Sequence, residues 1–264
     1  MIRLAANLSM MFNEHAFMDR FSAAAEAGFK GVEYLFPYAY SARELADALE
    51  QAQLAQVLFN LPPGDWEAGE RGLGSLPGRE AEFRDSVIQA LQYAEALDCP
   101  QIHAMAGVLP DQADASTRAE HEATYLRNLR YAASEAAKLN RTLLIEPINS
   151  RDMPNYFLSR QAQAMNLLKQ VEAPNLKLQF DLYHCQIMEG DLIRHLERQF
   201  EAIGHVQIAG APQRHEPDIG EIHYPALFER LEALGYDGWI SCEYRPAGAT
   251  REGLGWGREY GLAP

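Results

Sequence analysis

Four side chains with oxygen donors stand at or near the ends of short apolar runs in the second half of the chain: Glu146, Asp181, Gln207 and Glu243. Carboxylate and amide oxygens are the ligands that Mg²⁺ and Mn²⁺ prefer, whereas zinc usually takes imidazole or thiolate. Burying three carboxylates together is costly unless a cation balances their charge. The set therefore predicts a divalent metal site for Mg²⁺ or Mn²⁺, with neutralisation by arginine and lysine side chains as the alternative.

Other polar residues near these runs are candidates for holding a substrate. His184 follows Asp181 by three residues and is either a site residue or a surface histidine. Arg214 lies in a charged loop near the same rim, and its planar fork suits a carboxylate. Arg71 and Arg245 compete with Arg214 for that role, and a structural ion pair is the alternative for each arginine.

Two residues in the first half of the chain complete the candidate site. Asn60 ends the third apolar run, and His103 lies inside the fourth. Both are candidates for lining the mouth of the site, although a histidine within a strand is more often a core residue. The predicted substrate-binding residues are therefore His184, Arg214, Asn60 and Arg71.

These side chains can meet only if the runs that carry them are adjacent strands. Short apolar runs alternate with longer amphipathic segments along the chain, which is the pattern of repeated βα units. The predicted strands are Leu4–Leu8, Gly31–Leu35, Ala55–Asn60, Gln101–Ala106, Thr142–Glu146, Leu176–Asp181, His205–Ile208 and Trp239–Glu243. The predicted helices are Phe17–Ala27, Ala42–Ala52, Arg79–Leu97, Thr117–Lys138, Arg160–Val171, Asp191–Phe200 and Tyr224–Leu234. This α/β series favours a single (β/α)8 TIM barrel over a doubly wound sheet.

A barrel of this kind places its active site at the C-terminal ends of its strands, where the four oxygen-bearing residues converge. No linker or repeat interrupts the series, so we expect one domain over residues 1–264. Residues 61–78, with five glycines and three prolines, predict a loop over the barrel mouth. The Gly-rich residues 245–264 predict a C-terminal extension on the surface. Ser41 with Glu44 forms a capping box, and Ser159 is expected to start another helix.

Composition excludes several classes of partner. The 264 residues hold 23 lysines and arginines against 37 aspartates and glutamates, a formal net charge of −14. Such a surface repels phosphate backbones and anionic lipid, so neither nucleic acid nor a membrane is expected as a partner. Three scattered cysteines and the lack of a signal-peptide pattern favour the cytoplasm. HExxH, GxxxxGK[ST] and GxSxG motifs are absent, and the glycines from Gly253 to Gly257 do not lie between a strand and a helix, which disfavours redox cofactors and kinase chemistry.

Several motifs spread along the chain carry a family resemblance. They are Asn-Leu-Pro-Pro-Gly-Asp-Trp-Glu-Ala-Gly-Glu-Arg-Gly from Asn60, Leu-Ile-Glu-Pro-Ile-Asn from Leu144, Phe-Asp-Leu-Tyr-His-Cys-Gln from Phe180 and Cys-Glu-Tyr-Arg-Pro from Cys242. On these motifs the chain resembles the hydroxypyruvate isomerase family, which includes 2-oxo-tetronate isomerases, within the xylose-isomerase-like barrel superfamily.

The resemblance implies a divalent metal held by Glu146, Asp181, Gln207 and Glu243, with Glu146 and Glu243 also acting as proton donor and acceptor. The implied substrate is a small 2-oxo hydroxy acid. Interconversion of hydroxypyruvate and tartronate semialdehyde, or of 2-oxo- and 3-oxo-tetronate, moves a proton between adjacent carbons through an enediolate. The sequence leaves open which of these substrates is used, which glutamate is the base and whether the protein forms a homo-oligomer.

Three other functions are weighed against this one. A metal-dependent nuclease of the same superfamily would need more histidine ligands and a basic rim, which the charge opposes. A non-catalytic sugar-acid binding protein has no need of both Glu146 and Glu243. A ketose 3-epimerase is chemically nearest, because the same enediolate can be reprotonated on its opposite face. Gln207, where such epimerases typically carry a histidine, favours the isomerase.

Overall fold

The strands form a closed parallel barrel. The computed structural model describes residues 2–263, and within them eight strands follow one another around the barrel in chain order, with β8 pairing back to β1. They are β1 (Leu4–Asn7), β2 (Gly31–Glu33), β3 (Ala55–Asn60), β4 (Gln101–His103), β5 (Thr142–Ile145), β6 (Leu176–Asp181), β7 (Ile203–Ile208) and β8 (Ile240–Cys242). The predicted (β/α)8 fold is confirmed, and all eight predicted runs contain a strand.

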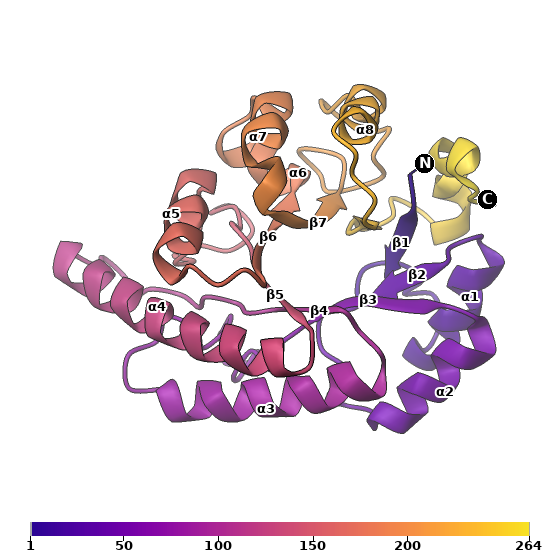
Figure 1. Ribbon diagram of the computed structural model, residues 1–264. Coiled ribbons are helices and arrows are strands. Elements are labelled where there is room, and N and C mark those ends of the chain that lie inside the picture. The colour runs from indigo at the N-terminus through magenta and orange to yellow at the C-terminus, as the bar shows by residue number, and fades with distance from the viewer. Residues whose placement is uncertain (1, 264) are drawn as a thin grey trace.

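The helices form an outer layer around the strands (Figure 1). They are α1 (Arg20–Glu26), α2 (Ala42–Ala52), α3 (Glu80–Ala96), α4 (Ala115–Lys138), α5 (Gln161–Val171), α6 (Leu182–Met188), α7 (Leu192–Gln199) and α8 (Tyr224–Ala233). Three 3₁₀ segments accompany them: η1 (Phe17–Asp19), η2 (Phe200–Ala202) and η3 (Thr250–Tyr260). Within residues 2–263, no helix has both the length and the apolar character that a membrane crossing requires.

Side-chain caps mark the first turn of α2, α4 and α6. The capping box predicted at Ser41 is present: Ser41 Oγ accepts from the Glu44 N–H at 3.2 Å, and the Glu44 carboxylate accepts from the Ser41 N–H at 2.9 Å. The helix start predicted at Ser159 is wrong. Helix α5 begins at Gln161, whose N–H donates to the Glu189 carboxylate at 2.7 Å. A side chain distant in the sequence thus supplies the hydrogen-bond acceptor that a local N-cap residue would otherwise provide.

Two helical segments are absent from the sequence prediction. Helix α6 follows β6 without a loop, and the Asp181 carboxylate caps it by accepting from the N–H groups of Tyr183 and His184 at 2.7 and 3.2 Å. Its seven residues are too few to display a helical period. Segment η3 lies in the Gly-rich C-terminal extension, whose glycines disfavour a helix. It is held by tertiary contact, because Thr250 Oγ1 accepts from the Phe12 N–H at 2.7 Å.

The barrel interior below the rim contains a buried polar network in addition to the apolar side chains that usually fill such barrels. The Glu33 carboxylate accepts from His205 Nε2 at 2.9 Å, from Gln207 Nε2 at 2.8 Å and from Asn7 Nδ2 at 2.9 Å. Gln101 Nε2 in turn donates to His205 Nδ1 at 3.1 Å. These bonds connect β1, β2, β4 and β7 directly beneath the strand ends that carry the candidate site.

The capping box gives a stability test of the fold. We expect Ser41→Ala to lower the free energy of unfolding by about 1 kcal/mol, because the Glu44 N–H loses its acceptor. Denaturant unfolding followed by circular dichroism measures this change. Ser134→Ala, at an exposed position in the middle of α4, is the control and should cause no loss. An equal loss in both variants would contradict the role assigned to the cap.

Candidate active site

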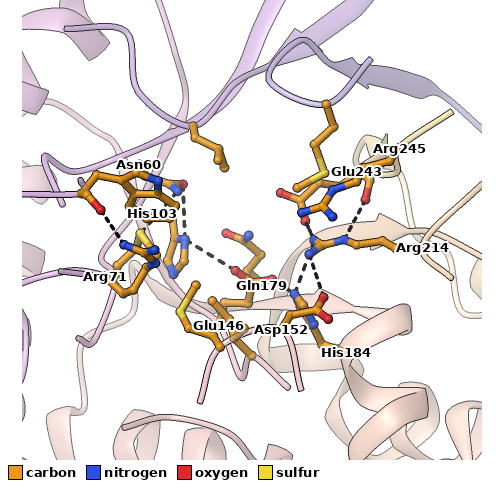
Figure 2. A pocket seen from close by; sticks show the side chains of 16 residues that line it. Asn60, Arg71, His103, Glu146, Asp152, Gln179, His184, Arg214, Glu243 and Arg245 are labelled. Carbon is orange, nitrogen blue, oxygen red and sulfur yellow. Dashed lines mark hydrogen bonds and ion pairs between the residues drawn. The ribbon is translucent and has the colours of Figure 1, made fainter. Parts of the chain in front are cut away.

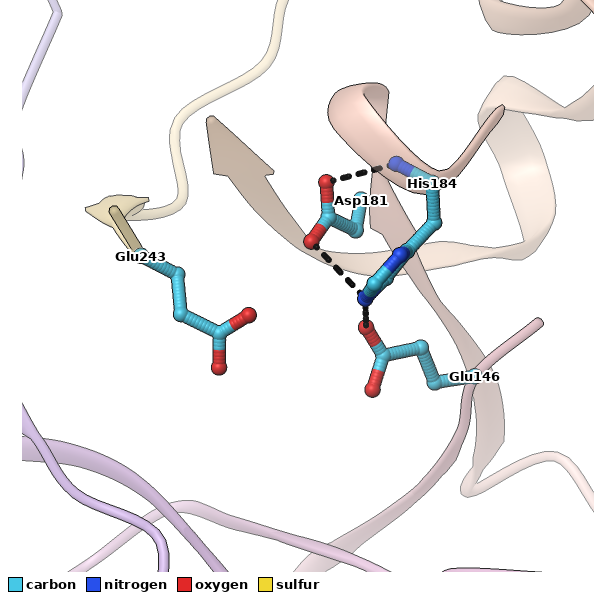
Figure 3. Close-up of side chains that lie close together, drawn as sticks. All are labelled: Glu146, Asp181, His184 and Glu243. Atoms are coloured by element: carbon cyan, nitrogen blue, oxygen red, sulfur yellow. Dashed lines mark hydrogen bonds and ion pairs between the residues drawn. The ribbon is translucent and has the colours of Figure 1, made fainter. Parts of the chain in front are cut away.

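A cluster of acidic residues and one histidine lies at the C-terminal rim of the barrel. Glu146 directly follows β5, Asp181 ends β6, Glu243 directly follows β8, and His184 lies in the first turn of α6. One ligand atom from each of the four residues lies within 4.8 Å of the others. Figure 3 shows the His184 ring between Asp181 and Glu146, with the Glu243 carboxylate approaching from the other side. This cluster could hold a metal ion.

The three carboxylates are buried and short of positive charge. Burial raises the pKa of Glu146, and repulsion from Glu243 and Asp181 raises it further. Burial likewise raises the pKa of Asp181 and brings the pKa of Glu243 to about 8. Glu146 Oε1 and Asp181 Oδ2 are buried oxygens without a hydrogen-bond partner among residues 2–263. Unpaired buried acceptors are rare in proteins, and a bound cation would satisfy both.

Gln207 lies on β7 beside Asp181, its register partner on β6. Gln207 Nε2 donates to Glu33 at 2.8 Å, and Gln207 Oε1 accepts from Gln179 Nε2 at 2.7 Å. Because a carboxylate only accepts, the bond to Glu33 determines which end of the Gln207 amide is oxygen. A carbonyl oxygen has two lone pairs, so Oε1 retains one for a further partner. Gln207 is therefore held in position with capacity to bind a cation.

Arg214 is the cation that contacts this carboxylate cluster within the described residues. Its Nη2 pairs with Glu243 and lies 3.8 Å from Asp181 Oδ2, and its Nη1 lies 3.2 Å from Asp152 Oδ2. Burial works against its charge, but Glu243 and Asp181 outweigh that effect and raise its pKa above the ordinary value. One guanidinium thus offsets part of the charge of three buried carboxylates, and most of its donors are used in doing so.

The proton of His184 is placed by Asn149. Asn149 Oδ1 accepts from the backbone N–H groups of Arg151 and Asp152 at 3.0 and 2.8 Å, so its Nδ2 faces His184 Nδ1 at 2.6 Å. Burial lowers the pKa of His184 well below its ordinary value, so the ring is neutral. Since Nδ1 accepts, Nε2 carries the proton. His184 therefore presents an N–H group 3.5 Å from Asp181 Oδ2 and 3.8 Å from Glu146 Oε1.

A cavity of about 360 Å³ opens above the cluster. Figure 2 shows Asn60, Arg71 and His103 on the side opposite Arg214 and Arg245. Arg71 belongs to the 61–78 segment, which connects β3 to α3 with neither helix nor strand. Its guanidinium lies 3.9 Å from the centre of the Trp66 ring, and its Nη1 donates to the backbone carbonyls of Trp66 and Glu70 at 2.9 and 2.7 Å. No carboxylate pairs with Arg71 among the described residues.

The structure brings all eight predicted site residues to this end of the barrel. Six of them line the cavity: Asn60, Arg71, Glu146, His184, Arg214 and Glu243. His103, the further candidate for lining the mouth, lines it as well. Asp181 and Gln207 lie at the ends of β6 and β7 beside them. Arg245 also lines the cavity. The arrangement joins two buried glutamates, a neutral histidine and two kinds of arginine, one paired with carboxylates and one stacked on a tryptophan.

Sequence reasoning missed several residues that complete the site. Gln179 and Asp152 line the cavity, and Asn149 and Glu33 hold His184 and Gln207 in orientation. Gln179 lies two residues before Asp181, so the period of a strand places both on one face, which is a signal that could have found it. Asn149 and Asp152 follow Glu146 in a polar stretch after the fifth strand, a position that in a barrel lines the mouth.

Curated relatives match over nearly the whole chain. A 2-oxo-tetronate isomerase from Cupriavidus necator is 58% identical over 260 residues, covering 98% of this chain and 99% of that protein. A hydroxypyruvate isomerase from Escherichia coli is 48% identical over 256 residues, covering 97% of this chain and 98% of that protein. Both of these relatives are named as isomerases.

Solved structures share the fold. A protein from Brucella melitensis, described as an AP endonuclease of family 2, superposes with a TM-score of 0.96 at 54% identity, covering 98% of this chain and 99% of that one. A 3-keto-D-glucoside 4-epimerase from E. coli superposes with a TM-score of 0.81 at 21% identity, which shows the fold alone. Residues 21–260 match the family described as xylose isomerase-like TIM barrel. The chain belongs to the xylose isomerase-like TIM barrel family.

Proposed function

We propose that this protein is a metal-dependent isomerase that moves a proton between adjacent carbons of a short 2-oxo hydroxy acid, hydroxypyruvate or 2-oxo-tetronate. The observation that carries the proposal is the pair Glu146 and Glu243, whose carboxylates face each other at the floor of one cavity with raised pKa values. A raised pKa lets a carboxyl group hold and release a proton, which suits both groups to exchanging protons with carbon. The names of the curated relatives support the same reaction.

The donor set fits a divalent cation with a preference for oxygen, Mg²⁺ or Mn²⁺. Glu146, Asp181, Gln207 and Glu243 would hold it, and the unpaired oxygens of Glu146 and Asp181 support this assignment. His184 presents an N–H group instead of a lone pair, which argues against it as a ligand. When bound, the cation balances the buried carboxylates and stabilises negative charge that develops on substrate oxygens.

The two glutamates divide the proton transfer. One carboxylate removes the proton from the hydroxyl-bearing carbon, and the electron pair of that bond moves toward the carbonyl to give the enediolate. The other carboxyl group delivers a proton to the former carbonyl carbon, while the hydroxyl proton passes to the other oxygen. Electrons are redistributed within the substrate, so no external oxidant or reductant is needed. We leave open which glutamate acts first.

The remaining predicted residues orient the substrate. His184 Nε2–H points into the space between the carboxylates, where it can donate to a substrate oxygen. Arg214 supplies charge beside Glu243 and Asp181, and its donors are largely engaged there. Arg71 is better placed to bind the substrate carboxylate, because its guanidinium bonds only to backbone carbonyls among the described residues and lines the opposite wall. Asn60 lines the same wall.

The rival functions receive less support. A ketose 3-epimerase shares the fold, but Gln207 stands where such epimerases typically carry a histidine. The Brucella relative carries an endonuclease description, yet a net charge of −14 disfavours an anionic polymer as substrate.

All three cysteines are free and buried, which is compatible with a reducing compartment, and we propose the cytoplasm.

The proposed reaction is tested by an isomerisation assay on metal-depleted protein that offers hydroxypyruvate and 2-oxo-tetronate in parallel, with Mg²⁺ or Mn²⁺ restored. Glu146→Gln and Glu243→Gln should each lower kcat by about 10²- to 10⁴-fold, since each removes a proton-transferring group. Glu50→Gln, at an exposed position on α2, is the matched control. Full turnover in either site variant, or after complete removal of divalent metal, would contradict the proposal.

Metal binding should depend on pH. Without metal the pKa of Glu243 is raised to about 8, so at lower pH this group is protonated and must lose its proton when a cation binds. For each proton released, affinity should fall about tenfold per pH unit as the pH drops below that value. Titration calorimetry in buffers of different ionisation enthalpy measures both the affinity and the protons released. An affinity that stays constant from about pH 6 to 8 would refute this linkage.

Arg71 and Arg245 can be separated as carboxylate-binding residues. Arg71→Ala should raise KM by about 10- to 100-fold with a smaller effect on kcat, because a charge-assisted bidentate bond is lost. Arg71→Lys should show a smaller rise in KM than Arg71→Ala but still a rise, since an ammonium group lacks the planar fork of arginine. Arg245→Ala is the comparison. If Arg245→Ala raises KM and Arg71→Ala does not, the assignment to Arg71 is wrong.

A further inference from the structure

The cavity contains two buried acceptors that the proposed reaction does not use. His103 Nε2 and Gln179 Oε1 lack a hydrogen-bond partner within residues 2–263. His103 is 1% exposed and Gln179 is 2% exposed, and both line the cavity above the carboxylates. They lie on β4 and β6, the strands on either side of β5, which leads to Glu146. Figure 2 shows both residues at the wall of the pocket.

The surrounding bonds make His103 Nε2 an acceptor. Asn60 Nδ2 faces Met105 Sδ at 3.7 Å, so Asn60 Oδ1 is the atom that lies 3.3 Å from His103 Nδ1. Glu146 Oε2 lies 3.6 Å from the same nitrogen. Because Asn60 Oδ1 can only accept, Nδ1 carries the ring proton. With the proton on Nδ1, Nε2 is the other ring nitrogen, buried and without a hydrogen-bond partner among the described residues, and it presents a lone pair.

The orientation of Gln179 is set by a chain of bonds that begins at Glu33. The Glu33 carboxylate can only accept, so Gln207 turns its Nε2 toward it at 2.8 Å. Gln207 Oε1 then faces Gln179, which must present its own Nε2, at 2.7 Å. The remaining atom of the Gln179 amide is its oxygen. Reversing the amide would place two acceptors or two donors together, so Gln179 Oε1 stays an unpaired acceptor.

Two buried acceptors without a donor select for a ligand that brings a hydroxyl group. A carboxylate or carbonyl oxygen cannot satisfy them. Hydroxypyruvate has one hydroxyl group, on the carbon that exchanges its proton, and that group belongs at the carboxylate cluster. 2-Oxo-tetronate has one hydroxyl more, on its terminal carbon. A substrate lacking that group leaves buried acceptors unpaired, which lowers its transition-state binding.

We propose that His103 and Gln179 bind the terminal hydroxyl group of a four-carbon 2-oxo-tetronate and thereby favour it over hydroxypyruvate. The inference rests on the proposed function, since it names the substrate class of that same site. The terminal O–H has one proton and donates to either of the two acceptors, one at a time, while the substrate carboxylate reaches toward Arg71. The reacting carbons then lie over Glu146 and Glu243.

The first test needs no variant. The wild-type enzyme with Mg²⁺ or Mn²⁺ is assayed on 2-oxo-tetronate, on its 4-deoxy analogue and on hydroxypyruvate. We expect kcat/KM for 2-oxo-tetronate to exceed that of the 4-deoxy analogue by about 10- to 100-fold, because the two differ by this hydroxyl group alone. Equal kcat/KM values for these two substrates would overturn the inference while leaving the isomerase function intact.

The second test assigns the preference to the acceptors. His103→Leu should reduce the ratio of kcat/KM between 2-oxo-tetronate and the 4-deoxy analogue toward unity, and Gln179→Met should reduce it as well. His121→Leu is the matched control, because His121 is also a buried histidine but bonds to Ser75 away from the cavity. An undiminished ratio in both site variants would assign the preference elsewhere and overturn the inference. Absence of turnover on every substrate in the wild type would overturn the proposed function and this inference with it.

Discussion

The burial of Glu33, Glu146, Asp181 and Glu243 inside the barrel and at its rim is the constraint on which the site depends, because each buried charge needs a partner. Glu33 lies below the rim and accepts from three N–H donors on two other strands, which hold its pKa below the ordinary value despite burial. Glu146, Asp181 and Glu243 lie at the rim, where Arg214 offsets only part of their charge. The lower carboxylate is satisfied by the protein, and the upper three are left with capacity for a cation.

The carboxylate of Glu33 determines how the side-chain amides of Gln207 and Gln179 are oriented. It accepts from Gln207, Gln207 accepts from Gln179, and Gln179 is left with an unpaired oxygen at the cavity wall. Each amide has one donor end and one acceptor end. The Glu33 carboxylate at the base therefore determines which end of the Gln207 amide, and then of the Gln179 amide, is the donor. Asn149 acts in the same way on His184, since two backbone N–H groups decide which atom it turns toward the ring. Preorganised donors and acceptors of this kind cost no reorganisation during the reaction.

The two walls of the cavity have different electrostatic character. The wall formed by β5 to β8 carries the carboxylates and a paired arginine, and the wall formed by the 61–78 segment carries Arg71 on the Trp66 ring. Stacking and two carbonyl contacts hold the Arg71 guanidinium in place without neutralising it. An anionic substrate can therefore enter a protein of net negative charge, because the local field in the pocket is set by a few nearby groups.

The order of strands, the barrel and most rim residues could be predicted from the sequence, because apolar runs, helical periods and polar residues at strand ends are local signals. Helix α2 begins and ends where predicted, since Ser41 and Glu44 satisfy its first turn within the segment itself. Helix α6 and segment η3 could not be predicted in this way: one is too short to show a period, and the other is held by contact with residues near the N-terminus.

The sequence by itself determined that Glu146, Asp181, Gln207 and Glu243 reach the barrel mouth, because strand order and the alternation of a strand are enough to place them there. Only the tertiary structure decided how those side chains are used. Glu33 and His205, 172 positions apart in sequence, meet inside the barrel. Arg214 is committed to Glu243 and Asp152, and Arg71 is not committed to any carboxylate among the described residues. The ion pairs of the arginines, the orientation of the side-chain amides and the tautomers of the histidines depend on atoms from different strands. No local pattern in the sequence encodes them.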